Sequence, residues 1–116
     1  MSAPIVFFDI AGPDFAAQRD FYSAIFDWEI AEDGRFTTGV VAPTVDALLR
    51  TDPADKMIYV GVEDVAATLK LVEEKGGTVD LERREVPGMI VLGLFRDPAG
   101  NHMGLVEMKD GEQVIP

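Results

Sequence analysis

The 116-residue chain carries 21 acidic and 10 basic residues, which gives a formal net charge of −11 at pH 7. This length suits one domain with a buried core and is too short for two independently stable ones. A strongly negative surface repels phosphate backbones and anionic lipid headgroups, so neither nucleic acid nor a membrane is an expected partner.

The chain has no cysteine and a single histidine, His102. The absence of cysteine excludes disulfides, thiolate nucleophiles and cysteine-based zinc or iron–sulfur sites. The N-terminal segment lacks the basic region and cleavage site of a signal peptide, and no apolar run approaches the roughly 18 residues of a membrane span. The sequence therefore predicts a cytoplasmic protein.

The first half of the chain predicts one helix among four strands. Asp14 is the expected N-cap of the helix, which ends near Asp27, and Asp33-Gly34 is a tight-turn signal between two strands. The strands are expected at residues 5–10, 28–32, 35–41 and 45–50.

The second half repeats this order after a short linker at residues 51–56. Asp64 is the expected cap of the second helix, and Gly76-Gly77 provides its stop. The C-terminal residues 110–116 are expected to be a frayed tail. The strands of this half are expected at residues 57–62, 78–82, 89–96 and 102–108.

The two halves are related by a duplication. Residues 6–22 and 56–72 align without a gap, so that Ile10 corresponds to Val60 and Asp14 to Asp64. Two copies cannot shield both ends of a stacked repeat, so they predict a pair of modules that close on each other. The space between them is where a functional site is expected.

The repeated βαβββ order, with the segments RDFYSAIFDW and FRDPAGNHMGLVE, resembles the vicinal oxygen chelate superfamily. This superfamily includes glyoxalase I, extradiol dioxygenases and bleomycin-resistance proteins. The resemblance implies an α+β fold in which two βαβββ modules, at about residues 4–51 and 56–108, form one domain with a curved mixed sheet. It also implies a homodimer.

Metal enzymes of that superfamily bind one divalent cation through the first and last strands of each module. The resemblance implies that three of the ligand positions fall at Phe7, Met57 and Gly104, none of which binds a hard divalent metal. The fourth falls within residues 45–50, where Asp46 is the only carboxylate. We therefore expect neither a metal nor another cofactor.

Strand alternation predicts which side chains line the cavity, because a helix covers the apolar face of each strand. The residues expected on the helix side are Val6, Phe8 and Ile10 in the first strand, Ile58, Val60 and Val62 in its counterpart, and Met103 and Leu105 in the last strand. The cavity lining is then Phe7, Asp9, Met57, Tyr59, His102 and Gly104.

Each lining residue also has a plainer interpretation. Phe7 and Met57 suit core packing, as most apolar strand residues do, and Asp9 suits an ion pair with a structural partner. His102 follows a turn and suits a position that is exposed or hydrogen-bonded to that turn, whereas Gly104 is expected to leave room where a ligand side chain would have been. No catalytic residue is assigned.

These features predict a glyoxalase/bleomycin-resistance-like protein that binds a small organic molecule between its modules without the metal of that superfamily. The acidic charge favours a drug-sequestering protein of the bleomycin-resistance kind. The alternative is a divalent-metal-dependent lyase, isomerase or dioxygenase that uses Asp9 and His102 as nonstandard ligands. An interaction domain without a ligand is the third possibility.

Overall fold

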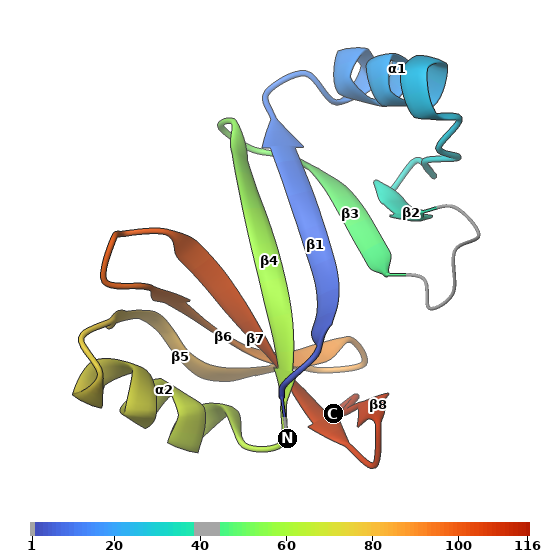
Figure 1. Ribbon diagram of the computed structural model, residues 1–116. Helices are drawn as coiled ribbons and strands as arrows, with labels where there is room; N and C mark the ends of the chain where they lie inside the picture. Colours follow the sequence, from blue (N-terminus) through green and yellow to red (C-terminus); the bar gives the residue numbers. More distant parts are fainter. Residues whose placement is uncertain (1, 39–44) are drawn as a thin grey trace. The chain divides into compact units, whose positions relative to one another are not determined.

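A computed structural model of the chain describes residues 2–38 and 45–116. Within these ranges, two helices and the eight strands of a mixed sheet form an α+β fold (Figure 1). The chain divides into two compact units, one comprising Phe7–Met57 and the other comprising Met1–Val6 with Ile58–Pro116. Neither of the two helices has the length and apolar character needed to span a bilayer.

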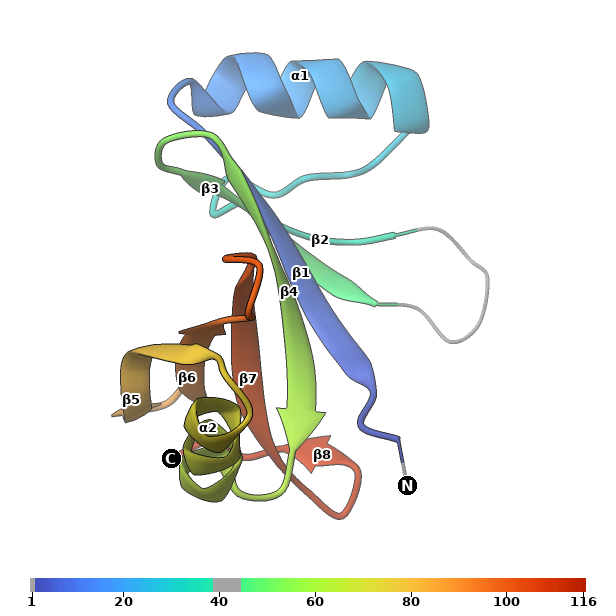
Figure 2. The same cartoon turned by 60° about the vertical axis from the view of Figure 1, so that its left-hand side comes forward.

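The unit Phe7–Met57 holds the N-terminal helix and three paired strands. β1 is parallel to β3, and β3 is antiparallel to β2. Helix α1 begins where Asp14 Oδ1 accepts a hydrogen bond from the Ala17 amide at 3.1 Å, as its N-cap role predicts. Figure 2 shows α1 beyond the ends of these strands. The elements are β1 (Ile5–Gly12), α1 (Phe15–Phe26), β2 (Arg35–Thr37) and β3 (Asp46–Thr51).

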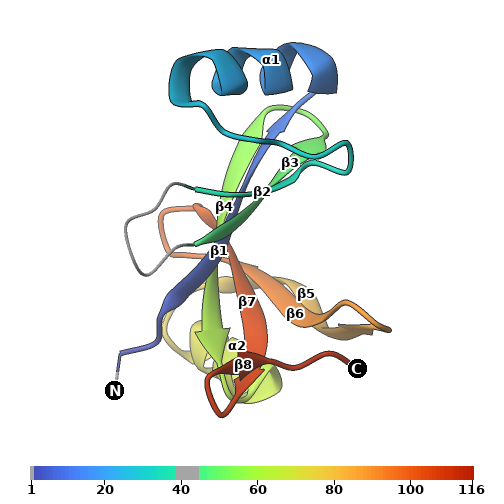
Figure 3. The ribbon, with the colours of Figure 1, turned by 90° about the vertical axis from the view of Figure 1, so that its right-hand side faces the viewer.

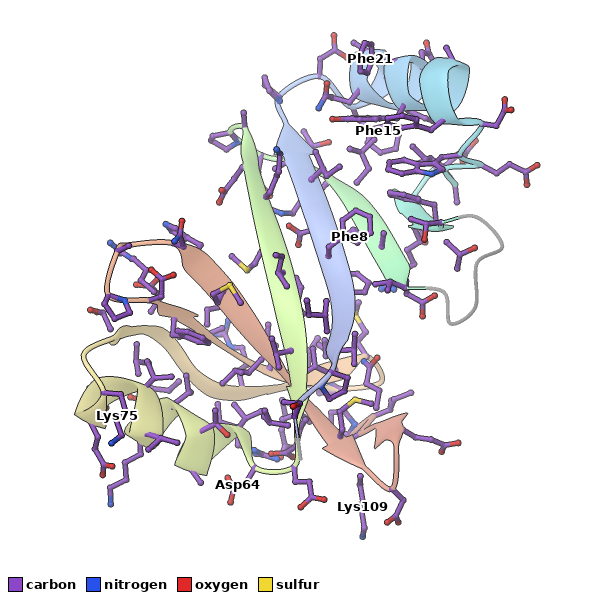
Figure 4. All side chains as sticks on the ribbon, viewed as in Figure 1. Phe8, Phe15, Phe21, Asp64, Lys75 and Lys109 are labelled. Carbon is purple, nitrogen blue, oxygen red and sulfur yellow. The ribbon has the colours of Figure 1, made fainter. Side chains whose placement is uncertain are left out.

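The core of this unit lies between α1 and the strands. Phe15 lies on the side of α1 that faces β1, whereas Phe21 lies on the opposite side and is 55% exposed (Figure 4). Phe8 and Ile10 pack against this core, which confirms the predicted helix side of β1. The buried residues at its centre are Phe36, Ala47 and Leu49.

The strand predicted at residues 28–32 is wrong. The carbonyl of Trp28 accepts a hydrogen bond from the Ser23 hydroxyl at 2.8 Å, so it is bound by the end of α1 and not by a neighbouring strand. The chain then turns tightly, with the Gly34 amide donating to the Ala31 carbonyl at 2.9 Å. The next predicted strand begins correctly at Arg35, and its residues 39–41 lie outside the described ranges.

The second unit contains a helix on one face of a sheet. The strand order is β4-β7-β6-β5, with β4 parallel to β7 and the other pairs antiparallel. Helix α2 lies along β5 and β6 (Figure 1). The elements are β4 (Asp55–Val62), α2 (Val65–Glu74), β5 (Thr78–Val86), β6 (Ile90–Arg96), β7 (His102–Lys109) and β8 (Glu112–Gln113).

The packing of α2 follows from its cap and its apolar face. Asp64 Oδ1 accepts the Ala67 amide at 2.9 Å, as the sequence predicts. Figure 4 shows Asp64 at the start of the helix and Lys75 at its end. Val60 and Val62 pack against the buried cluster of Val65, Leu69 and Leu105, as predicted for the helix side. Ile58, which was predicted on the same side of β4, is 42% exposed.

The C-terminal tail is ordered by β7, and the prediction of a frayed tail is wrong. Asp110 and Gly111 have φ values of 53° and 79°, which reverse the chain in a tight hairpin. β8 then pairs with β7, and Figure 3 shows the two strands side by side. The Asp-Gly pair is itself a hairpin signal, so this turn was detectable in the sequence.

Candidate functional site

The six residues predicted to line a cavity are divided between the two units. Phe7, Asp9 and Met57 belong to the unit Phe7–Met57, and Tyr59, His102 and Gly104 belong to the other. The residues of each unit form their own local arrangement.

Asp9 is the buried carboxylate of the first unit. Its side chain is 2% exposed, and its Oδ1 lies 3.0 Å from Nε of Arg50 on the neighbouring strand β3. The same guanidinium contacts Asp52 at 3.0 Å and Asp55 at 3.8 Å. Of the two roles that the sequence left open for Asp9, the structure shows the ion pair.

Arg50 is held in its charged form by these carboxylates. Burial opposes its charge, but hydrogen bonds with Asp9 and Asp52 outweigh burial and raise the pKa of Arg50 above its ordinary value. A cation at this position repels a metal ion that would approach Asp9. Arg50 therefore compensates the charge of Asp9, and this carboxylate has a structural role.

Phe7 and Met57 contribute apolar side chains to the same unit. Met57 is 8% exposed and Phe7 is partly buried. Such positions suit core packing and the wall of an apolar cavity alike. Neither side chain offers the oxygen or nitrogen donor that a hard divalent cation needs.

Gly104 provides space for an aromatic ring in the second unit. It lies opposite Tyr59 in the parallel pair of β7 with β4. A Cβ atom on Gly104 would be 2.5 Å from Cε2 of Tyr59 and would also collide with Cδ2. The room that the sequence assigned to a ligand at Gly104 is thus filled by the Tyr59 ring.

His102 is exposed at the start of β7, opposite Arg96 of β6. Arg96 Nε donates to both carboxylate oxygens of Asp80, at 3.1 and 3.0 Å. Arg96, and to a smaller extent His102, lower the pKa of Asp80. Asp80, Arg96 and His102 are thus exposed polar residues on the three neighbouring strands β5, β6 and β7.

The carboxylate of β7, Glu107, belongs to the opposite face from Gly104. Arg83 donates to its two oxygens from Nε at 3.0 Å and from Nη2 at 2.7 Å, and the Val65 amide donates to Oε1 at 3.3 Å. The hydrogen bonds from Arg83 are the main reason that the pKa of Glu107 is lowered. Glu107 therefore joins β5, β7 and the start of α2.

We expect the replacement of Glu107 with glutamine to destabilise the protein near neutral pH and to have little effect in acid. Because folding lowers the pKa of Glu107 below its ordinary 4.5, the carboxylate stabilises the fold above that value and loses this contribution as the pH falls through the folded pKa. Urea unfolding between neutral pH and about pH 3 measures the difference from the parent protein.

The matched control for this measurement is Glu82→Gln on the exposed surface of β5. Its difference from the parent protein is expected to be small at every pH. A Glu107→Gln difference that stays constant across the titration would contradict the ion-pair account.

The divalent metal of the resembled superfamily does not fit these residues. Phe7 and Met57 lack suitable donor atoms, Gly104 has no side chain, and Asp9 is paired with Arg50. Within residues 2–38 and 45–116, no three histidine, aspartate or glutamate side chains are grouped so that they could hold a metal ion. A set of at least three ligands is needed for a typical site of this kind.

Comparison with known proteins identifies relatives from Streptomyces. The anthracycline biosynthesis protein DnrV of Streptomyces peucetius is 28% identical, over 80% of this chain and 42% of DnrV. The anthracycline biosynthesis protein DauV of Streptomyces sp. strain C5 is 27% identical with the same coverage. The chain therefore spans less than half the length of these two relatives.

Solved structures share the fold at low sequence identity. A methylmalonyl-CoA epimerase in complex with methylmalonyl-CoA and ammonium superposes with a TM-score of 0.67, at 19% identity over 98% of this chain and 100% of the epimerase chain. A glyoxalase/bleomycin resistance protein/dioxygenase superfamily member from Vibrio splendidus 12B01 gives 0.64, at 12% identity over 92% and 100% of the two chains. A family model described as a glyoxalase-like domain matches residues 5–106. The chain thus belongs to the family of glyoxalase-like domains.

Proposed function

We propose that this glyoxalase-like chain binds a small organic molecule without a divalent metal. The observation that supports this proposal is the replacement of donor side chains at the expected ligand positions by Phe7, Met57 and Gly104. The ion pair of Asp9 with Arg50 also supports the proposal, because Arg50 already compensates the charge of this carboxylate. Apolar walls with few polar groups suit an organic ligand.

The proposed ligand is a planar aromatic natural product of the anthracycline type. The two relatives are named for anthracycline biosynthesis. The net charge of −11 attracts a cationic ligand of this kind. We propose that the protein is a cytoplasmic homodimer that sequesters this molecule, as bleomycin-resistance proteins do.

We expect daunorubicin to raise the melting temperature of the protein in a concentration-dependent manner, equally with and without a chelator. A ligand that binds only the folded state stabilises it in proportion to the logarithm of its concentration. Phe7→Ala is expected to reduce the rise, measured from the variant's own melting temperature. The exposed aromatic residue Phe21 provides the matched control, and Phe21→Ala is expected to retain the rise.

Elemental analysis of the purified protein separates this function from the metal-dependent alternative. One equivalent of a divalent metal that is lost in His102→Ala would favour the lyase, isomerase or dioxygenase and would overturn the metal-free proposal. A melting temperature that daunorubicin leaves unchanged would contradict the proposed ligand.

A further inference from the structure

The chain contains two Asp-Gly pairs, Asp33-Gly34 and Asp110-Gly111. In such a pair the main-chain nitrogen of glycine can attack the side-chain carboxyl group of aspartate, because glycine has no side chain to obstruct the approach. The structure places both pairs in turns but gives them different surroundings. The two pairs have the same chemistry, so a difference in their reactivity reflects the fold.

The reaction converts aspartate into isoaspartate through a cyclic imide. At Asp110, the nitrogen of Gly111 bonds to Cγ, and the hydroxyl of the protonated carboxyl group leaves with the amide proton as water. Another water molecule then opens the ring. Opening at the main-chain carbonyl of Asp110 leaves Cγ bonded to Gly111, so the main chain runs through Cβ and is longer by one carbon atom. The net change is an isomerisation without gain or loss of atoms.

The Asp33-Gly34 pair is held on both sides of this reaction. Gly34 is buried, and its amide donates a hydrogen bond to the Ala31 carbonyl at 2.9 Å. Oδ1 of Asp33 accepts a hydrogen bond from the Arg35 amide at 3.0 Å. The attacking nitrogen and the attacked carboxyl group are both engaged, so they can meet only after this turn opens locally.

The Asp110-Gly111 pair is open to solvent. Both residues are exposed, and a Cβ atom on Gly111 would meet no other atom within 4 Å. Within the described ranges, no ion pair or hydrogen bond engages the carboxylate of Asp110, and no backbone hydrogen bond holds the amide of Gly111. The bonds that restrain Asp33 and Gly34 therefore have no counterpart at the second pair.

The turn at Asp110 positions the C-terminal segment, residues 112–116. Beyond this turn the Val114 amide donates to the Glu107 carbonyl at 2.9 Å, and the Pro116 carbonyl accepts the Gly88 amide at 2.9 Å. Figure 3 shows β8 beside β7 directly after the turn. Loop length fixes the register of a hairpin, so an additional main-chain atom in a two-residue loop disturbs these bonds.

We propose that Asp110 is a site of isoaspartate formation in the folded protein and that the fold protects Asp33. The modification loosens the C-terminal segment and leaves the turn at Gly34 unchanged. It involves none of the residues of the proposed ligand-binding function, so either proposal can fail without the other.

The test compares the two sites in one sample. The folded protein is kept near neutral pH at physiological temperature for several weeks, and isoaspartate is then located by tryptic digestion and mass spectrometry with electron-transfer fragmentation. We expect isoaspartate to accumulate at least about tenfold faster at Asp110 than at Asp33, because the reaction at Asp33 requires local opening. In guanidinium chloride the two rates are expected to become similar.

Two matched variants accelerate the same reaction. Asp110→Asn and Asp33→Asn form the same imide with loss of ammonia, and asparagine suits the turn that Asp110 occupies. The first variant is expected to lose ammonia in the folded state well before the second. Hydrogen exchange of the Val114 and Gly88 amides is expected to be faster in the converted protein, with the Gly34 amide unchanged. Circular dichroism verifies the fold of both variants.

Three results would overturn the proposal. The first is equal accumulation at the two sites in the folded protein, or a preference for Asp33. The second is a difference that persists in guanidinium chloride, which would assign the preference to neighbouring residues in the sequence and not to the fold. The third is unchanged hydrogen exchange at Val114 and Gly88 in the converted protein, which would contradict the loosening of the C-terminal segment.

Discussion

Replacing Gly34 with alanine is expected to destabilise the protein by about 3 kcal/mol. Gly34 has φ 88°, which is left-handed, and a Cβ atom there would collide with the backbone carbonyl oxygen of Leu49. The same pair is joined by a hydrogen bond from the Leu49 amide to the Gly34 carbonyl at 2.6 Å. The strand β3 cannot move away from the new methyl group without loss of this bond. Urea unfolding measures the change in free energy.

The control for this experiment is Gly88→Ala. Gly88 has φ 73°, but a Cβ atom there would meet no other atom within 4 Å. Only the backbone strain remains, which amounts to about 1 kcal/mol. Equal losses in the two variants would show that the contact with Leu49 is not the cause of the larger effect.

Replacing Arg50 with methionine is expected to destabilise the protein by about 3 kcal/mol. The substitution leaves the carboxylate of Asp9, which is 2% exposed, without its guanidinium partner. Breaking a buried ion pair is costly because the remaining charge has lost its compensation. The expected loss lies at the lower end of the range for breaking a buried ion pair, because the side chain of Arg50 is 25% exposed.

Two further variants test this explanation. The double variant Asp9→Leu with Arg50→Met is expected to regain most of the lost stability, because an apolar pair no longer buries a charge. Arg35→Met removes an exposed ion pair with Asp33 at 3.7 Å and is expected to have little effect. A double variant that is less stable than Arg50→Met would contradict the role given to Asp9.

The main secondary structure follows from local signals in the sequence. The caps Asp14 and Asp64 form the predicted hydrogen bonds, and the apolar alternation of β1, β4 and β7 predicts the side that each helix covers. These features depend on neighbours in the chain, so a pattern of few residues is enough to specify them. The Asp110-Gly111 hairpin is also specified by neighbouring residues, although it was not predicted.

The error at residues 28–32 has a different origin. The pattern of Trp28 and Ile30 is apolar at alternate positions, and it fits a strand as well as an irregular segment. The Ser23 hydroxyl binds the Trp28 carbonyl, and Trp28 packs between aromatic rings from α1 and β2. The alternation of apolar and polar residues does not reveal that a side chain will bind this carbonyl.

For the candidate site, the sequence by itself determined which side chains stand at the expected ligand positions. The resemblance to the vicinal oxygen chelate superfamily implies where the ligands would stand, and the side chains of Phe7 and Met57 and the bare backbone of Gly104 offer no donor for a hard divalent metal. The tertiary structure decided what the remaining groups do. It brings Arg50 of β3 to Asp9 of β1 and lays the Tyr59 ring over Gly104, because strand pairing joins residues that are distant in the chain. A sequence pattern specifies the face on which a side chain lies, but only the register between strands specifies which partner neutralises it or fills the space beside it.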